Sequence, residues 1–106
     1  MSQFPLRYES TIGDLEHKLS DMIDAGSEFD IERNGDVLMI EFEDGERFVI
    51  TPQTPFEQVW VSANYAGDRF NWSEEKNEWV NEKNSENLFF YIRRALSQKL
   101  GYPVNL

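Results

Sequence analysis

Carboxylates concentrate in the first half of the chain, at spacings that place several of them on one surface. Residues 1–46 contain 13 acidic and three basic side chains, whereas residues 47–106 contain seven of each. The entire formal charge of −10 therefore belongs to the first segment. Carboxylate oxygens are hard ligands that suit iron, Mn²⁺, Ca²⁺ or Mg²⁺ better than copper or structural zinc. Since no dedicated cage motif is present, the pattern predicts a shallow, exposed cation site of modest affinity.

The same acids allow two other interpretations. They suit an electrostatic docking patch for a basic protein, and they also suit a surface that simply keeps a small domain soluble. Under any of these interpretations the acidic surface repels nucleic acid and anionic membranes. We therefore expect neither as a partner.

A second constellation of polar and aromatic residues lies between Pro52 and Ser62. If Val59 and Val61 face the core, then Gln53 or Gln58, Trp60 and Ser62 face outward, because side chains alternate along a strand. An outward tryptophan flanked by amides is typical of an interface anchor. The alternative is that Trp60 packs against long side chains on an ordinary open sheet.

Residues for nucleophilic or thiolate chemistry are missing. The chain has no cysteine, its only histidine is His17, and it contains no nucleophile-elbow, phosphate-loop or dinucleotide motif. A lone histidine on a helix beside acids is more often a surface residue than a metal ligand. We therefore expect no enzyme. The absence of a signal-peptide pattern and of a long apolar run favours a cytoplasmic protein.

The periodicity predicts the elements that must position these residues. Apolar residues at three- and four-residue spacing predict a helix over residues 5–24 and a second from about Asn84, capped by Asn84 or Ser85. Alternation with period two predicts strands over residues 28–33, 37–43, 47–51, 58–63, 69–72 and 78–80. Asn34-Gly35 and Asp44-Gly45 predict hairpin turns in which both residues have positive φ. This order predicts an α+β, two-layer sandwich: an antiparallel five- to six-stranded sheet with both helices on one face.

Several of these segments resemble the frataxin family. The run Gln53-x-Pro55-x-x-Gln58-Val59-Trp60-Val61-Ser62 resembles the sheet motif of that family. Arg69-Phe70-Asn71-Trp72 with Trp79-Val80, and Asn34-Gly35-x-Val37-Leu38, resemble two further blocks. The similarity covers about residues 6–100, and the short N-terminus looks like the bacterial branch. It implies a single frataxin-like domain over residues 1–106.

The resemblance implies a role that composition alone did not indicate. Proteins of this family bind Fe²⁺ or Fe³⁺ weakly through an acidic ridge and dock on the cysteine desulfurase–scaffold complex that builds iron–sulfur clusters, whose rate they modulate. The implied ridge positions are Glu16, Asp21, Asp24, Glu28, Asp30 and Glu32. The implied partner-binding positions are Gln53, Gln58, Trp60 and Arg69. We expect a monomer in the absence of metal.

The sequence departs from the family pattern in two respects, and two other functions are also considered. Thr51 stands where the family often has asparagine, and Ser20, Met22, Ala25 and Gly26 stand where relatives often carry further acids. One alternative is a generic acidic binding module that mimics nucleic acid. The other is an iron-oxidising or iron-storing protein, which is disfavoured because ferroxidase centres use Glu-x-x-His pairs that this chain lacks.

Overall fold

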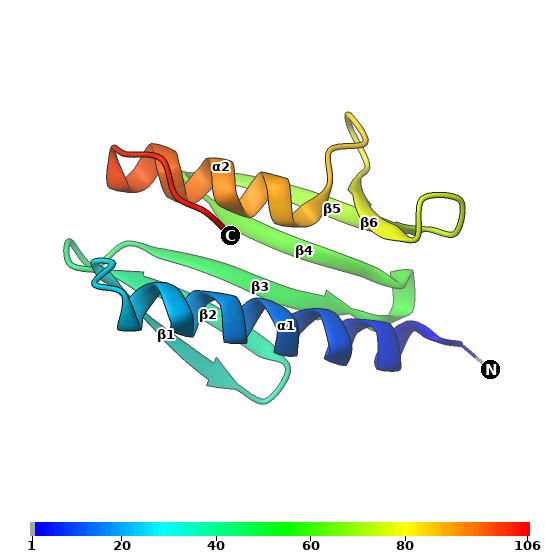
Figure 1. Ribbon diagram of the computed structural model, residues 1–106. Coiled ribbons are helices and arrows are strands. Elements are labelled where there is room, and N and C mark those ends of the chain that lie inside the picture. The colour runs from blue at the N-terminus through cyan, green and yellow to red at the C-terminus, as the bar shows by residue number, and fades with distance from the viewer. Residues whose placement is uncertain (1) are drawn as a thin grey trace.

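The computed structural model describes residues 2–106 as two helices, one short 3₁₀ turn and six strands (Figure 1). In chain order the elements are α1 (Phe4–Asp24), β1 (Phe29–Asn34), β2 (Val37–Phe42), β3 (Arg47–Gln53), η1 (Thr54–Phe56), β4 (Gln58–Ala63), β5 (Ala66–Ser73), β6 (Glu78–Asn81) and α2 (Leu88–Leu100). The strands form one antiparallel sheet in the order β1-β2-β3-β4-β5-β6. Among residues 2–106, neither helix combines the length and apolar character needed to span a bilayer.

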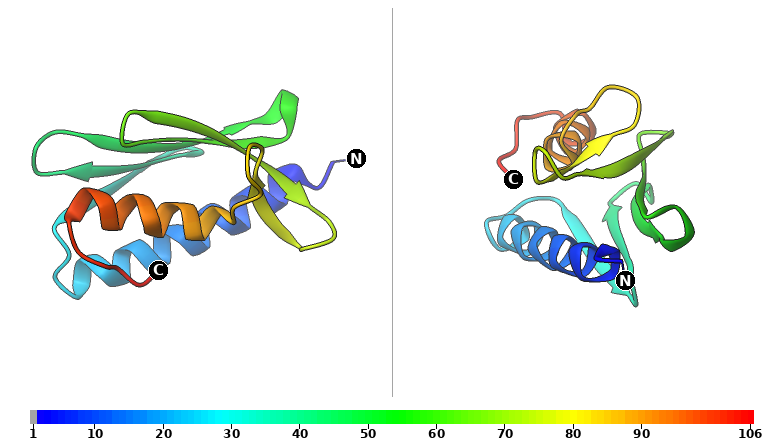
Figure 2. Two further views of the ribbon diagram at one scale, coloured as in Figure 1. Left: turned by 90° about the horizontal axis from the view of Figure 1, so that it is seen from above. Right: turned by 90° about the vertical axis from the view of Figure 1, so that its right-hand side faces the viewer.

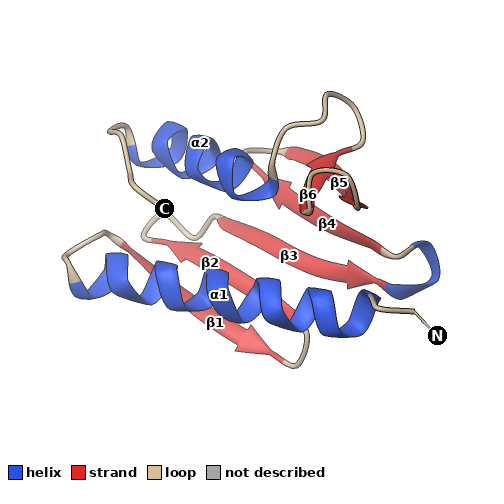
Figure 3. Ribbon diagram, turned by 45° about the vertical axis from the view of Figure 1, so that its right-hand side comes forward, coloured by secondary structure: helices blue, strands red, loops and turns tan. Residues whose placement is uncertain are grey.

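Both helices lie side by side on one face of the sheet, and the other face has no helix over it (Figure 2). The C-terminal tail turns back between the two helices (Figure 3). This arrangement confirms the predicted two-layer sandwich and fixes the number of strands at six. Because an antiparallel sheet needs only one covered face, the opposite face remains available for polar and aromatic side chains.

The apolar stripe of α1 meets the inward residues of the strands, as the spacing predicts. Its buried members are Phe4, Tyr8, Ile12, Leu15 and Leu19. The inward residues of β2, β3 and β4 include Leu38, Ile40, Phe48, Ile50, Val59 and Val61, each at most 2% exposed. From α2 the buried set is Leu88, Tyr91, Ile92, Ala95 and Leu96, whereas Phe89 and Leu100 are only partly buried. One continuous core therefore joins both helices to the sheet.

The start of α2 differs from the prediction. Asn87, rather than Asn84 or Ser85, caps the helix, and its Oδ1 accepts hydrogen bonds from the backbone N–H groups of Phe89 and Phe90. Ser85 has a left-handed φ of 62° and donates its N–H to the carbonyl of Asn81. The segment before Asn87 therefore forms a loop back to β6 and cannot continue the helix.

Two hairpin turns also differ in detail. Asn34 still belongs to β1, and the loop consists of Gly35 and Asp36, of which only Gly35 has positive φ. The β4–β5 connection is shorter than predicted, because β5 begins at Ala66 and only Asn64 and Tyr65 form the turn. Both of these have positive φ, which suits the twist of a two-residue hairpin.

A buried polar network fastens α2 to the sheet. The Tyr91 hydroxyl donates to Asp68 Oδ2 at 2.7 Å, and Asn81 Nδ2 donates to Asp68 Oδ1 at 3.3 Å. The Lys83 ammonium lies 3.3 Å from the same carboxylate. Burial alone would raise the pKa of Asp68, but these three partners outweigh it, and the pKa is lowered from 3.8.

This network predicts a pH-dependent contribution to stability. We expect Tyr91→Phe to lower the free energy of unfolding near neutral pH by about 1–2 kcal/mol, because the Asp68 carboxylate loses a hydrogen bond. Because the pKa of Asp68 is lower in the folded state than its ordinary value of 3.8, the ionised carboxylate stabilises the fold at pH values above 3.8. This contribution to the free energy of unfolding disappears as the pH falls through the pKa of the folded state. The loss of unfolding free energy caused by Tyr91→Phe, measured by urea denaturation, should therefore become smaller as the pH falls through the pKa of Asp68 in the folded state. Tyr65→Phe, whose parent side chain is 94% exposed, is the matched control. A deficit that is independent of pH would contradict this account.

Candidate functional site

The six predicted ridge acids follow the C-terminal half of α1, the loop after it and the edge strand β1. All are exposed except Glu16, which is half-buried. Within residues 2–106, no group of three or more histidine or carboxylate side chains converges closely enough to hold a metal ion. Among the described residues, the six acids therefore lie along an open surface.

Four acids line one hollow beside the start of β1. It encloses about 390 Å³, and its lining includes Glu28, Asp30, Glu41 and Glu43. Asp30 lies directly opposite Glu41 in the β1–β2 ladder. Like charges at such a pair repel across the strands, and a bound cation would relieve that repulsion. The structure thus brings two of the predicted ridge residues, Glu28 and Asp30, together with two acids of β2 and its turn.

At the other end of the ridge, the side chain of Arg33 pairs with two acids. Arg33 Nη2 lies 2.7 Å from Glu9 Oε2, and its Nη1 lies 3.2 Å from Glu16 Oε1. The hydrogen bond to Glu9 is the main reason that the pKa of Arg33 is raised, with Glu16 adding to it. Glu16 is therefore engaged by a guanidinium. This ion pair was not predicted, because the sequence does not reveal which residue of β1 faces which turn of α1.

A weaker pair involves the lone histidine. His17 Nε2 lies 3.6 Å from Asp21 Oδ2, and both side chains are largely exposed. The structure therefore places His17 beside one ridge acid, on the surface of α1. No second histidine is available to complete a metal centre of the ferroxidase type.

The four predicted partner-binding residues come together on the open face of the sheet. Trp60 pairs with Arg69 on β5, and Gln53 pairs with Gln58 in the β3–β4 ladder. The guanidinium carbon of Arg69 lies 4.7 Å from the centroid of the Trp60 ring. Beside this stack a hollow of about 300 Å³ is lined by Thr51, Ser62 and Gly67 as well. We call this group, Gln53, Gln58, Trp60 and Arg69, the open-face surface.

Hydrogen bonds within the open-face surface hold Trp60 in place. Its Nε1–H donates to Gln58 Oε1 at 2.9 Å, and Gln58 Nε2 donates to Asn71 Oδ1 at 3.1 Å. Gln58 therefore lies on the open face, but it is only 8% exposed. Its amide is engaged by Trp60, Asn71 and Glu82, the last at 3.4 Å. Gln58 acts on the surface through the indole that it orients.

Two residues near the open-face surface were not predicted to belong to it. Phe56, on η1, stacks on Trp60 with ring centroids 6.1 Å apart and planes 15° from parallel, and it is 64% exposed. Asn71 accepts the amide of Gln58 from the neighbouring strand. Phe56 follows Pro55 in the connection before β4, so the run Pro55-Phe56 was the available signal. Its position beside Trp60 depends on the path of η1.

The ion pairs of Arg33 with Glu9 and Glu16, which we call the Arg33 clamp, give a prediction about the stability of the ridge. We expect Arg33→Gln to lower the free energy of unfolding by about 0.5–1 kcal/mol, because Glu9 and Glu16 lose their cation and repel the other ridge acids. Added sodium chloride should narrow the deficit by screening that repulsion. Lys76→Gln, in the exposed β5–β6 turn, removes the same charge away from the ridge and should cost less. Thermal melts at low and high salt measure both effects, and an equal deficit in the two variants would show that the clamp does not stabilise the fold.

Comparisons with known proteins agree with this geometry. A family model described as the frataxin-like domain matches residues 1–102. A protein of Janthinobacterium sp. (strain Marseille), named iron-sulfur cluster assembly protein CyaY, is 33% identical over 99% of this chain and 94% of its own length. The protein of that name in Pseudomonas fluorescens (strain Pf0-1) is 29% identical over 95% of this chain and 93% of its own.

A solved structure of frataxin from Psychromonas ingrahamii has the same fold. It superposes with a TM-score of 0.76 at 21% identity, covering 93% of each chain. At that identity the likeness concerns the fold alone. The sequence match is what defines the relationship, because the family model spans nearly the whole chain. The chain therefore belongs to the frataxin-like family.

Proposed function

We propose that this protein is an iron-binding regulator of iron–sulfur cluster assembly that docks on a cysteine desulfurase–scaffold complex. The observation that carries the proposal is the open-face surface, where an oriented Trp60, stacked between neighbours, stands on a sheet face without a covering helix. Relatives bear the name iron-sulfur cluster assembly protein, which supports the same process for this chain. The proposal includes a cytoplasmic, non-enzymatic protein that is monomeric without metal.

In this proposal the ridge and the open-face surface have different roles. The ridge, with its surplus of unneutralised acids, attracts a basic surface of the desulfurase and binds iron weakly. The open-face surface supplies an aromatic anchor, for which tryptophan and arginine are the residue types most often responsible at interfaces. Because contacts between charged patches are screened by salt, the ridge contributes to association mainly at low ionic strength.

The binding of iron rests on the chemistry of the donors. The hollow lined by Glu28, Asp30, Glu41 and Glu43 offers four carboxylates, beside the hydroxyl of Ser27, and such oxygen ligands suit a hard cation. Their spread over an open surface agrees with weak binding and with an ion that is passed on or sensed. Oxidation or storage of iron is disfavoured, since the single histidine, His17, is not part of a Glu-x-x-His pair.

The anchoring role of Trp60 gives a prediction about docking. We expect Trp60→Ala to abolish most capture of the desulfurase–scaffold complex in a pull-down, because it removes the ring that Phe56 and Arg69 support. Truncating such an anchor typically costs 2 kcal/mol or more, which corresponds to about a 30-fold loss of affinity. Tyr65→Ala removes a highly exposed aromatic side chain elsewhere and should bind like the parent. Thermal melts establish that both variants fold.

Two outcomes would contradict this prediction. A folded Trp60→Ala variant that binds like the parent would favour a charge-only mimic of nucleic acid. No capture by the parent protein even at low salt would reject docking altogether.

Iron binding at the ridge gives a prediction about thermal stability. We expect the double variant Asp30→Asn, Glu32→Gln to melt at a higher temperature than the parent without metal, because the Asp30–Glu41 repulsion is removed. Its response to Fe²⁺ under anaerobic conditions should decrease. In the parent, iron at about ten times the dissociation constant should add roughly 1.4 kcal/mol, which corresponds to about 4–8 °C in the melting temperature.

Controls for the ridge variant use the same thermal melts. Glu75→Gln removes a negative charge from the β5–β6 turn, far along the chain from β1, and should leave the iron response unchanged. Monovalent salt should stabilise the parent only at much higher concentration than iron. If the double variant melts lower than the parent and keeps the full iron shift, these acids are not the metal site.

A further inference from the structure

The outer edge of β1 is a free edge of the sheet. β1 spans six residues and pairs only with β2, because it stands first in the strand order. Both helices pack on one face of the sheet (Figure 2). A strand at the end of a sheet presents unpaired N–H and C=O groups, which can pair with another extended chain. The edge of β1 is therefore suited to the addition of a further strand.

The register of the β1–β2 hairpin shows which backbone groups of β1 point outward. Its two-residue loop is closed by the pair Asn34–Val37, and the pair that closes such a loop is hydrogen-bonded. Hydrogen-bonded and non-hydrogen-bonded pairs alternate along an antiparallel ladder, so the pair Phe29–Phe42 is of the second kind. The N–H of Phe42 agrees with this, because it turns away from β1 and donates to the carbonyl of Glu46.

Every second residue of β1 therefore turns its N–H and C=O groups to the outside. These residues are Phe29, Ile31 and Arg33. Within residues 2–106 no backbone hydrogen bond from another segment reaches them. An extended chain that runs antiparallel to β1, as β2 does on the other side, can pair with all three positions.

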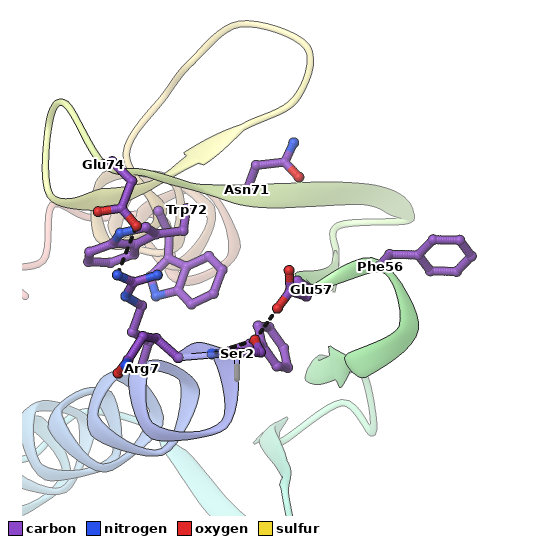
Figure 4. A pocket seen from close by; sticks show the side chains of 10 residues that line it. Ser2, Arg7, Phe56, Glu57, Asn71, Trp72 and Glu74 are labelled. Carbon is purple, nitrogen blue, oxygen red and sulfur yellow. Dashed lines mark hydrogen bonds and ion pairs between the residues drawn. The ribbon is translucent and has the colours of Figure 1, made fainter.

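The opposite edge of the sheet offers much less. β6 is four residues long, and an isolated bridge already joins its Val80 to Asn87 before α2. The β5–β6 turn is also tied to the first turns of α1, because Arg7 Nη2 lies 2.8 Å from Glu74 Oε1 (Figure 4). We therefore expect strand addition at β1 and not at β6.

The side chains of β1 specify which kind of strand fits. Asp30 and Glu32 are exposed on the open face, whereas Ile31, on the helix side, is half-buried against the core. Residues directly opposite each other on neighbouring strands lie on the same face. A strand with basic residues opposite the two acids and an apolar residue opposite Ile31 is therefore complementary in charge and in hydrophobicity.

A second copy of this chain is a poor occupant of the edge. Pairing two β1 strands places Glu28, Asp30 and Glu32 of one copy beside the same acids of the other. Both copies also carry a net charge of −10, which opposes their association. The exposed acids thus protect the edge against self-pairing and leave it open to a basic strand.

We propose that the outer edge of β1 accepts an extended basic segment of a partner protein as a seventh, antiparallel strand of the sheet. The backbone groups of Phe29, Ile31 and Arg33 pair with the segment, and its alternate Lys or Arg side chains lie beside Asp30 and Glu32. This inference deepens the proposed docking function and rests on it, because it gives the form in which a basic partner meets the ridge.

The test is an NMR titration of the full chain, at low ionic strength, with a short blocked peptide of alternating lysine and valine. We expect saturable shifts centred on β1, with a dissociation constant of about 1 mM or below. The amide hydrogen of Ile31 should become protected from exchange in the complex, whereas that of Glu32, already bonded to β2, should change little. A peptide of alternating glutamate and valine should not bind.

N-methylated peptides separate strand addition from simple attraction between charges. In the proposed pairing the valine N–H groups point to β1, and the lysine N–H groups point to solvent. Methylating two valine nitrogens should therefore weaken binding by about tenfold or more. Methylating two lysine nitrogens leaves the charge and the pairing edge intact, and it should weaken binding by about threefold or less.

Variants of the protein test the contribution of the acids. Glu32→Lys should weaken the unmodified peptide by about fivefold or more, because it replaces an attraction by a repulsion. Glu75→Lys is the matched control, since it reverses the same charge in the exposed β5–β6 turn and should bind like the parent. Thermal melts check that both variants fold.

Several results would overturn the proposal. These are equal effects of the two methylated peptides, no protection of Ile31, and the same affinity in Glu32→Lys and Glu75→Lys. Protection of Ile31 that rises with protein concentration in the absence of peptide would show that a second copy occupies the edge instead. The pull-down of the desulfurase–scaffold complex is a separate measurement. If the peptide fails to bind while the complex is still captured, docking stands and strand addition alone is rejected.

Discussion

One-sided burial of the sheet is the constraint on which the rest of this structure depends. The inward side chains of the strands pack with the stripes of α1 and α2 into a single core, which contains most of the buried apolar side chains of residues 2–106. The opposite face must therefore be stable in water, and it meets this requirement with polar and aromatic side chains that bond to one another across the strands. The open-face surface is a consequence of this division.

Charge is distributed in two different ways around this core. Some acids are neutralised within the fold: Glu9 and Glu16 by Arg33, and Asp44 and Glu46 by Lys99, which fastens the end of α2 to the β2–β3 turn. The acids around the start of β1 have no such partner on their own strand pair, where Asp30 faces Glu41. Asp30 and Glu41 repel each other at this end of the ridge, where the nearest cross-strand cation is Arg47 opposite Glu41, and a cation or basic partner bound there would relieve the repulsion.

The two arginine–tryptophan stacks differ in how their indoles are hydrogen-bonded. At Trp60 the indole N–H is bonded to Gln58, so the stack presents a fixed aromatic surface suited to a protein partner. At Trp72 the indole N–H is buried and has no hydrogen-bond partner among residues 2–106, and the stacked Arg7 pairs with the exposed Glu74. The first stack has a hydrogen-bonded indole, whereas the second leaves its indole N–H unsatisfied within the described residues.

The sequence by itself determined the order of the elements, the core-facing stripes and the outward position of Trp60, because helix and strand periods and turn residues are local properties. The individual ridge and open-face positions were implied by the resemblance to the frataxin family. Only the tertiary structure decided that Arg33 reaches Glu9 and Glu16, that Trp60 donates to Gln58, and that α2 begins after Asn87. Each of these depends on which turn of a helix lies over which strand, or on how one strand's side chain leans over its neighbour. Such choices are made by packing between segments far apart in the chain, and no local pattern encodes them.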